Sequence, residues 1–432
     1  MKVSYYSLGC KVNLYESEAI VNEFIENGFE LTNFDDICDI YIINTCTVTK
    51  TSDAKSRKII RQAIKKNPNA VICVMGCYSQ LHPDEVKQIE GVDVIVGTSN
   101  RIMLYPLAMS ALEKKNPQVL IQDALKTKNY EELKIKRFNN KTRGFMKIED
   151  GCNNFCTYCA IPYARGPVRS RNHQDVIDEI KLLTEQGTKE IVLTGINTAA
   201  YGSDLKDYTF AKLLEDIVKN VPNLGRIRIS SIEATEITDE LLSIIAENRE
   251  KFCNHFHIPL QSGSDKILQK MARKYNLDYY RKKIQRIRQL FPGVNITTDV
   301  MVGFSGETNE DFNDIKNFIN EIKFGEMHVF PYSKRPGTKA YTYPDEVDEI
   351  TKKVRVNELL LVNEQNALAY RQNFVGTVQE VIIEKIENGK AFGHTSNYMD
   401  IEFDALDSKV NDLVQVEIIE AGYPISIGKL GR

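Results

Sequence analysis

Three cysteines stand close together near the middle of the chain, at Cys152, Cys156 and Cys159. Three thiolates on one loop can bind a [4Fe-4S] cluster, and one of its four irons is then left without a protein ligand. That open iron is a site for a substrate or cofactor. Structural zinc is the alternative, but zinc prefers four protein ligands in separated pairs, and the next Cys or His is His173. The spacing therefore favours an iron–sulfur cluster.

Three further cysteines each follow an apolar run that is typical of a buried strand. They are Cys10, Cys46 and Cys77. Because the carboxyl ends of parallel strands gather at one edge of a sheet, we expect these thiols to meet and to hold a second cluster with an open iron. The alternatives are buried thiols without a ligand, or a four-cysteine zinc site that includes Cys73. Cys38 precedes its strand and is expected at the opposite edge.

The segments between these cysteines predict the sheet that positions them. Apolar strands alternate with amphipathic helices up to residue 97, which is typical of a parallel sheet that is buried on both faces. The predicted strands cover residues 3–9, 39–45, 70–76 and 92–97, and the predicted helices cover 16–27 and 54–66. This first part is therefore expected to be a small α/β domain.

A second alternation of strands and helices surrounds the cysteines at 152–159. Six strand–helix units predict a partial (βα)6 barrel, short of the eight strands of a complete one. The predicted strands cover 144–149, 190–194, 226–231, 255–260, 295–302 and 326–330. A long helix over 345–373 and a small β-barrel after it complete the expected α/β fold. The expected parts are an N-terminal domain at 1–125, a basic connector at 126–140, the barrel with its trailing helix at 141–372, and the C-terminal β-barrel at 373–432.

Length and charge agree with this division. The 432 residues correspond to about three domains, and the charges nearly cancel, with 56 basic and 59 acidic residues. Nucleic-acid binding would therefore depend on local charge: residues 126–147 and 266–288 are basic, whereas 374–432 is acidic. No apolar run is long enough to span a membrane and no secretion signal is present, so we expect a cytoplasmic protein with reduced cysteines.

The motifs around the cysteines are similar to those of a known family. CNNFCTYCAIPYARG at 152–166 resembles the signature of radical S-adenosylmethionine (SAM) enzymes. With LGCKVN around Cys10, NTC at Cys46, GCYSQ around Cys77 and the β-rich tail, the chain resembles the methylthiotransferases along essentially its full length. The resemblance implies an auxiliary-cluster domain, a radical SAM barrel and a C-terminal TRAM domain.

The form LGCKVN, with Lys11 and Val12, resembles the MtaB type within that family, and RGPVRSR at 165–171 supports it. This branch is associated with 2-methylthiolation of N6-threonylcarbamoyladenosine beside the tRNA anticodon. The resemblance implies two [4Fe-4S] clusters and SAM, with one cluster cleaving SAM and the other delivering the methylthio sulfur. Because the C2–H of adenosine is neither acidic nor electrophilic, a radical is required and no side chain is expected to act as a general base. The implied partners are the tRNA anticodon stem-loop, a low-potential electron-donor protein and a sulfur source, with no membrane involved.

The resemblance also implies which residues contact the cofactors. Several strand-end segments look like the family's SAM-facing segments, and catalytic groups concentrate at such ends of barrel strands. The SAM candidates are Tyr158, Thr194, Gly195, Asn197, Ser231, Glu233 and Gln261. The cluster candidates are Cys10, Cys46, Cys77, Cys152, Cys156 and Cys159. The family more often has Pro where Ser305 stands, and His255 and His257 are expected to be packed or hydrogen-bonded rather than metal-bound.

Two other functions remain open from the residues alone. The same machinery in the ribosomal-protein branch modifies an aspartate, and a zinc-organised RNA-binding protein would use the cysteines structurally without catalysis. The acidic tail cannot attract RNA by bulk charge, so we expect it to contact RNA through aromatic groups such as Tyr398. Iron and sulfide analysis, with detection of 5′-deoxyadenosine, would separate the enzyme from the binding protein.

Overall fold

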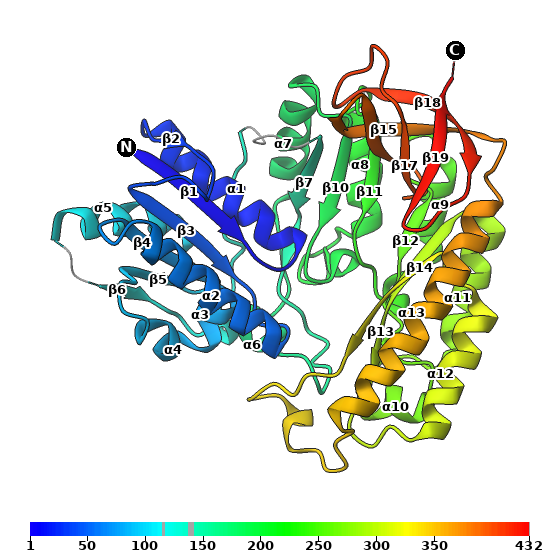
Figure 1. Ribbon diagram of the computed structural model, residues 1–432, viewed down its shortest axis with the longest axis horizontal. Coiled ribbons are helices and arrows are strands. Elements are labelled where there is room, and N and C mark those ends of the chain that lie inside the picture. Colours follow the sequence, from blue (N-terminus) through cyan, green and yellow to red (C-terminus); the bar gives the residue numbers. More distant parts are fainter. Residues whose placement is uncertain (115–116, 137–141, 432) are drawn as a thin grey trace.

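The computed structural model describes residues 1–114, 117–136 and 142–431, and Figure 1 shows their arrangement. The N-terminal part is a parallel sheet in the order β2-β1-β3-β4-β5-β6. Its strands are β1 (Lys2–Ser7), β2 (Glu30–Leu31), β3 (Ile40–Thr45), β4 (Val71–Gly76), β5 (Val94–Val96) and β6 (Gln118–Leu120). Its helices are α1 (Lys11–Glu26), α2 (Lys50–Lys66), α3 (Cys77–Leu81), α4 (Pro83–Lys87) and α5 (Leu104–Lys114).

Alternate residues of the central strands pack on opposite faces of this sheet. Ile40 and Ile42 of β3 pack with α1 and α5, whereas Tyr41 and Ile43 pack with α2 and α4. Burial on both faces explains why β3 reads as a continuous apolar run, and the predicted parallel sheet is confirmed. The short edge strands β2 and β6 were not predicted, because two or three residues carry too little pattern.

The central part is a six-stranded parallel barrel that remains open on one side. Its strands are β7 (Arg143–Lys147), β10 (Glu190–Thr194), β11 (Arg226–Ile229), β12 (His255–His257), β13 (Asn295–Val302) and β14 (Glu326–Pro331). Bridges between Ile227 and Phe252 and between Ser231 and His257 join the two three-stranded halves. Its helices are α6 (Ile161–Arg165), α7 (His173–Glu185), α8 (Phe210–Asn220), α9 (Asp239–Glu247), α10 (Asp265–Lys270), α11 (Leu277–Leu290), α12 (Asn309–Ile322) and α13 (Glu349–Gln372). The partial barrel is thus confirmed, with the short ribbon β8 (Glu149–Asp150) and β9 (Arg169–Ser170) added beside β7.

The C-terminal part is a closed barrel in the order β15-β16-β17-β19-β18, as predicted. Its strands are β15 (Val378–Glu387), β16 (Lys390–Thr395), β17 (Asp400–Asp404), β18 (Leu413–Glu420) and β19 (Ile425–Leu430). It covers the amino ends of the central strands (Figure 1). Arg226 donates to the carbonyl of His394 at 3.1 Å, and the Asn295 side chain donates to the carbonyl of Asn397 at 2.8 Å.

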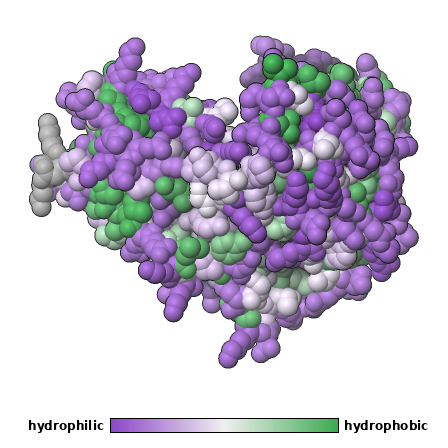
Figure 2. Space-filling view, turned by 90° about the horizontal axis from the view of Figure 1, so that it is seen from below, coloured by the Kyte–Doolittle hydropathy of each residue, from purple (hydrophilic) through white to green (hydrophobic). Residues whose placement is uncertain are grey.

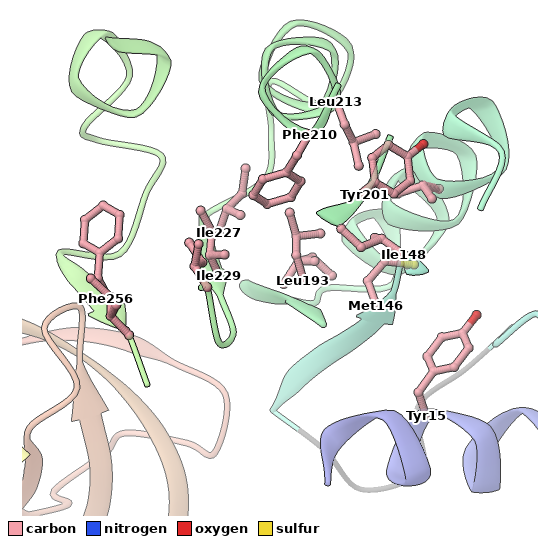
Figure 3. Packing of buried hydrophobic residues seen from close by; sticks show 14 of the residues in the cluster. Tyr15, Met146, Ile148, Leu193, Tyr201, Phe210, Leu213, Ile227, Ile229 and Phe256 are labelled. Carbon is pink, nitrogen blue, oxygen red and sulfur yellow. The ribbon is translucent and has the colours of Figure 1, made fainter. Parts of the chain in front are cut away.

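The N-terminal and central parts share one hydrophobic core. In Figure 3, Tyr15 of α1 lies beside β7, which carries Met146, with Ile148 directly after the strand. The Tyr15 hydroxyl donates to the carbonyl of Leu133, a buried residue of the connector. A continuous core fixes the two parts relative to each other, which matters because each carries one cysteine trio. The predicted connector at 126–140 extends into residues 137–140, which lie outside the described ranges.

None of the helices in the described ranges combines the length and apolar character that crossing a bilayer requires.

Candidate active site

The loop trio, Cys152, Cys156 and Cys159, lies between β8 and α6 at the carboxyl end of the central barrel. All three cysteines line one cavity of about 250 Å3. The loop folds tightly because Gly151 has a φ of +87°, and a Cβ there would lie 2.0 Å from the carbonyl oxygen of Pro167. One short turn of chain therefore presents three thiols to one space.

Burial governs the protonation of these thiols. It raises the pKa of Cys152 and of Cys159 to about 12 each, and neighbouring thiols of the trio act in the same direction. The Arg273 guanidinium lies 3.5 Å from the Cys156 sulfur. Because a bound metal deprotonates coordinating thiols, this donor set fits an iron–sulfur cluster.

Two buried amide oxygens on the cavity wall lack a partner. Asn197 and Gln261 both line the cavity, and neither Asn197 Oδ1 nor Gln261 Oε1 has a hydrogen-bond partner among the described residues. Gln261 also has a φ of +67°, which is strained for a residue with a side chain. Buried polar atoms are normally satisfied, so this wall fits a ligand that supplies donors, as the amino group of SAM can.

Glu233 and Tyr158 also line the cavity. The Glu233 carboxylate forms an ion pair with Arg273, whose side chain is only 4% exposed. The Tyr158 ring packs edge-on against Phe304, with centroids 6.4 Å apart. Sequence reasoning placed Arg273 only in the basic run 266–288, but the structure buries it at the site. No local sequence pattern indicated that Arg273 belongs to the site, because its partner Glu233 lies 40 residues away in the chain.

Thr194, Gly195 and Ser231 do not line this cavity, in contrast to the other four SAM candidates. A Cβ at Gly195 would lie 2.1 Å from Glu149 Oε1, so this glycine leaves room for the buried Glu149 carboxylate. That carboxylate accepts a hydrogen bond from the backbone N–H of Asn197 at 2.6 Å. Gly195 therefore acts indirectly: it leaves space for Glu149, and Glu149 fixes the backbone of Asn197 on the cavity wall. Glu149 was not predicted as part of the site.

The assembled trio, Cys10, Cys46 and Cys77, forms where β1, β3 and β4 end beside one another. A Cβ at Gly9 would lie 3.0 Å from the Cys46 sulfur, so the turn before Cys10 packs directly on that thiol. Burial raises the pKa of Cys77 to about 12, although the Arg165 guanidinium, whose Nε lies 3.3 Å from the sulfur, opposes this. The thiols of Cys46 and Cys10 are near enough to raise it further. The strand-end prediction is thus matched by three thiols that interact, a donor set that fits a second cluster.

The loop after Cys46 connects the two trios. Val48 and Thr49 line the same cavity as the loop trio. Arg335, on the segment after β14, donates to the Thr47 hydroxyl at 2.6 Å and forms an ion pair with Asp53 at 2.6 Å. These contacts hold the loop against the barrel mouth. No local sequence pattern indicated this arrangement, because Arg335 and Thr47 are 288 residues apart.

A buried charge network lies between the N-terminal part and the barrel. Arg165 contacts Glu16 at 2.8 Å and Asp150 at 2.9 Å, and Lys147 contacts the same two carboxylates at 2.8 and 2.6 Å. Arg101 joins at 3.2 Å from Glu16. Burial alone would raise the pKa of Glu16, but these three cations lower it to about 2. The network is ionised, and Arg165 links it directly to Cys77.

Polar side chains also line the inside of the barrel. Asp299 lies between His257 and His328, at 3.4 and 3.2 Å, and these hydrogen bonds lower the Asp299 pKa despite its burial. His257 and His255 each hydrogen-bond to the Thr297 hydroxyl at 2.9 Å. Both histidines are therefore hydrogen-bonded, as predicted. The His257–Asp299–His328 group also has the donor types and closeness of a cation site.

Tyr398 is half-buried and contacts residues at the amino ends of the central strands. Its ring centroid lies 4.4 Å from the Arg228 guanidinium, and its hydroxyl accepts from Arg143 at 3.3 Å. The expectation that Tyr398 contacts RNA stays a prediction. Lys11, the first residue of α1, also interacts electrostatically with Tyr398, and burial together with Arg143 and Arg228 lowers the pKa of its ammonium.

The basic runs are largely paired with acidic neighbours, which weakens the expectation that they bind phosphates. In 266–288, the ion pairs include Lys266–Asp311, Arg273–Glu233, Arg281–Glu321, Lys282–Asp278 and Arg286–Asp239. In the described part of 126–147, they include Lys134–Asp175, Lys136–Glu26 and Arg143–Glu384. Residues 137 and 141 of that run are outside the described part. The high local charge is thus mostly balanced in the fold.

Family models match two parts of the chain. The Radical SAM superfamily matches residues 146–319, and the Uncharacterized protein family UPF0004 matches residues 2–97. A solved radical SAM methyltransferase, TsrM from Kitasatospora setae, shares the fold with a TM-score of 0.57 at 14% identity, covering 79% of this chain and 76% of that one. The fold and the loop trio thus define a radical SAM enzyme, a class that uses a [4Fe-4S] cluster and SAM.

Curated relatives define the family within that class. "Threonylcarbamoyladenosine tRNA methylthiotransferase MtaB" of Bacillus subtilis is 46% identical over 100% of this chain and 96% of its own length. The protein of the same name from Aquifex aeolicus is 37% identical over 97% and 100%. A "tRNA-2-methylthio-N(6)-dimethylallyladenosine synthase" of Thermoanaerobacter pseudethanolicus is 36% identical over 96% and 90%. The chain therefore belongs to the radical SAM methylthiotransferase family and is a transferase.

Proposed function

We propose that this enzyme converts N6-threonylcarbamoyladenosine in tRNA to its 2-methylthio derivative. The names of the Bacillus and Aquifex relatives support this substrate. The observation that carries the reaction type is the loop after Cys46, because its residues Val48 and Thr49 line the cavity of the loop trio. A two-cluster transfer requires both trios to serve one space, and this loop connects them.

Each trio has a distinct role in the proposal. Cys152, Cys156 and Cys159 hold a [4Fe-4S] cluster, and SAM lies beside it against Tyr158, Asn197, Glu233 and Gln261. Cys10, Cys46 and Cys77 hold the second [4Fe-4S] cluster. When bound, these groups supply the radical and the sulfur that substitution at an unactivated C–H requires.

The protein's own residues bind, orient and shield. Arg273 holds the Glu233 carboxylate in place and sets its positive charge beside Cys156. Glu149 fixes the backbone of Asn197, and Gly195 leaves room for the Glu149 side chain. Thr194 and Ser231 support the strand ends through backbone pairing with Ile148 and His257. Apolar residues such as Val48 and Met301 line the same cavity and exclude water from a reactive intermediate.

The remaining partners follow from the chemistry. Reductive cleavage of SAM needs a low-potential electron donor, and repeated turnover needs a sulfur source. In this proposal the tRNA anticodon stem-loop approaches at the notch that Figure 2 shows between the lobe of the N-terminal part and the rest of the molecule. We propose a cytoplasmic enzyme, because its proposed substrate is tRNA.

The decisive variant is C46A, prepared anaerobically and assayed with tRNA that carries the threonylcarbamoyl group. We expect it to lose about half of its iron, to keep forming 5′-deoxyadenosine and to form no 2-methylthio nucleoside by mass spectrometry. C73A is the matched control, because Cys73 is buried inside β4 and should leave iron and product unchanged. Methylthio product from C46A would overturn the two-cluster assignment, and iron loss in C73A would favour a four-cysteine site.

A further inference from the structure

The inside of the barrel holds three cations near one another, and two of them have carboxylate partners. Arg143 forms an ion pair with Glu384 at 2.9 Å, and Arg228 pairs with Glu190 at 2.8 Å. Lys11 is half-buried, and its side chain has no hydrogen bond or ion pair with any described residue. It is therefore the cation in this group that forms no ion pair with a described residue, although the Glu190 carboxylate attracts it.

The surroundings of Lys11 locate its ammonium inside the barrel. It interacts electrostatically with Arg143 on β7, with Arg228 on β11 and with Tyr398 from the C-terminal barrel. It also acts on His255 of β12 and on His328 of β14. These five residues come from five different strands or turns around the lumen, so the ammonium faces the inside of the barrel.

An unpaired, half-buried cation beside two guanidinium groups is costly in the free protein. It loses hydration, and the like charges of Arg143 and Arg228 repel it. An anionic group of a ligand would remove both costs. Lys11 directly follows Cys10, so such a group would be held next to the assembled trio, where the substrate must be presented.

The proposed substrate carries one anionic group that a simpler adenosine lacks. Its N6 substituent is a threonine joined through a carbamoyl link, which leaves the threonine carboxylate free. The phosphates of the tRNA backbone are also anionic, but they lie on every nucleotide and could not distinguish the modified base.

We propose that Lys11 binds the carboxylate of the N6-threonylcarbamoyl group and so selects this substrate. The inference rests on the proposed function and deepens it by naming a specificity-determining residue. The ammonium and carboxylate form a charge-assisted hydrogen bond within a partly dehydrated lumen, where such bonds are stronger than between neutral groups. The nearby Arg143 and Arg228 are already paired and add favourable potential without direct contact.

The test compares two anticodon stem-loops, one with the free threonine carboxylate and one in which it is a neutral primary amide. Binding to the anaerobically reconstituted enzyme is measured for wild type, K11Q and K11R. We expect wild type to prefer the acid by about tenfold or more, K11Q to bind both equally, and K11R to recover most of the preference. K58Q removes the same charge from the exposed face of α2 and should keep the wild-type preference. Iron content and 5′-deoxyadenosine formation confirm that each variant is intact.

The outcomes separate this inference from the proposed function. If wild type shows no preference, or if K11Q retains it, the role of Lys11 is wrong while methylthiolation can still stand. If K11Q weakens both stem-loops equally, Lys11 contacts a different anion, which also overturns the inference. If wild type forms no 2-methylthio product on either stem-loop, the proposed substrate itself is wrong.

Discussion

Cys152, Cys156 and Cys159 lie on one loop, whereas Cys10, Cys46 and Cys77 meet because three strands of a parallel sheet end together. The loop trio needs only a local turn, which Gly151 permits. The assembled trio needs the sheet, the turn at Gly9 and the docking of Arg165 from the other domain. A local site can be read from spacing, but a tertiary site depends on every element that brings its parts together.

The largest expected effect separates the two trios by chemistry. We expect both C77A and C156A to lose the methylthio product by more than a hundredfold and to lose about four irons each. Only C156A should also lose 5′-deoxyadenosine formation, because only the loop trio lines the cavity with Asn197 and Gln261. Iron analysis and product chromatography measure both quantities. Loss of SAM cleavage in C77A would show that the trios do not act separately.

The second effect tests the dependence of the assembled trio on docking. R165M removes a guanidinium that is 0% exposed and leaves Glu16 and Asp150 short of a partner. Breaking a buried ion pair in this way should lower the free energy of unfolding by about 3 to 5 kcal/mol. Urea unfolding followed by circular dichroism measures it. R249M is the control, because Arg249 is exposed, donates to the carbonyl of Leu290 and packs over the Phe291 ring without an ion pair to a described carboxylate. A loss below about 1 kcal/mol in R165M would contradict the prediction.

The third effect is the pH dependence of stability that Glu236 causes near the loop trio. Glu236 accepts a hydrogen bond from the Asn197 side chain at 2.7 Å, and Asn197 lines the cavity. Burial raises the pKa of Glu236 to about 7 from 4.5, and its Oε2 has no partner among the described residues. The folded state therefore holds the proton more tightly than the unfolded state, so this group makes stability fall as pH rises from about 5 to about 7. The decrease should be at most about 3 kcal/mol. Urea midpoints across this range should show it in wild type, and E236Q should remove that part of the slope. An unchanged slope in E236Q would sink the assignment.

The smallest effect tests how the cavity wall binds its ligand. Gln261 Oε1 is buried and unpartnered, so Q261A removes an acceptor that SAM would satisfy. We expect the dissociation constant for SAM to rise about tenfold, with iron content unchanged. Calorimetry of the iron-loaded protein measures this, and T194A serves as the control because Thr194 does not line the cavity. An equal loss in both variants would mean that the wall acts only through strand-end structure.

These regions also show what the sequence could predict. The sheet, the six-stranded barrel and the C-terminal barrel followed from apolar periodicity, and the strand-end rule placed the assembled trio. Thr194 and Gly195 do not line the cavity because a shift of one or two residues at a strand end changes which residues face inward, and here Ile196 and Asn197 do. Arg273, Arg335 and Lys11 were not assigned to the site, since their partners come from distant segments and no local pattern reports such contacts.

The C-terminal barrel closes one end of the central barrel. Its His394 and Tyr398 meet Glu190, Arg228 and Arg143 at the amino ends of the central strands. Without that cover, the lumen would open to solvent at the amino ends of the central strands, and several buried charged groups would lose their ion-pair partners. The C-terminal barrel thus seals the lumen at the end opposite the loop trio. Deleting it should let water enter the lumen from that end and reach the site of the radical reaction.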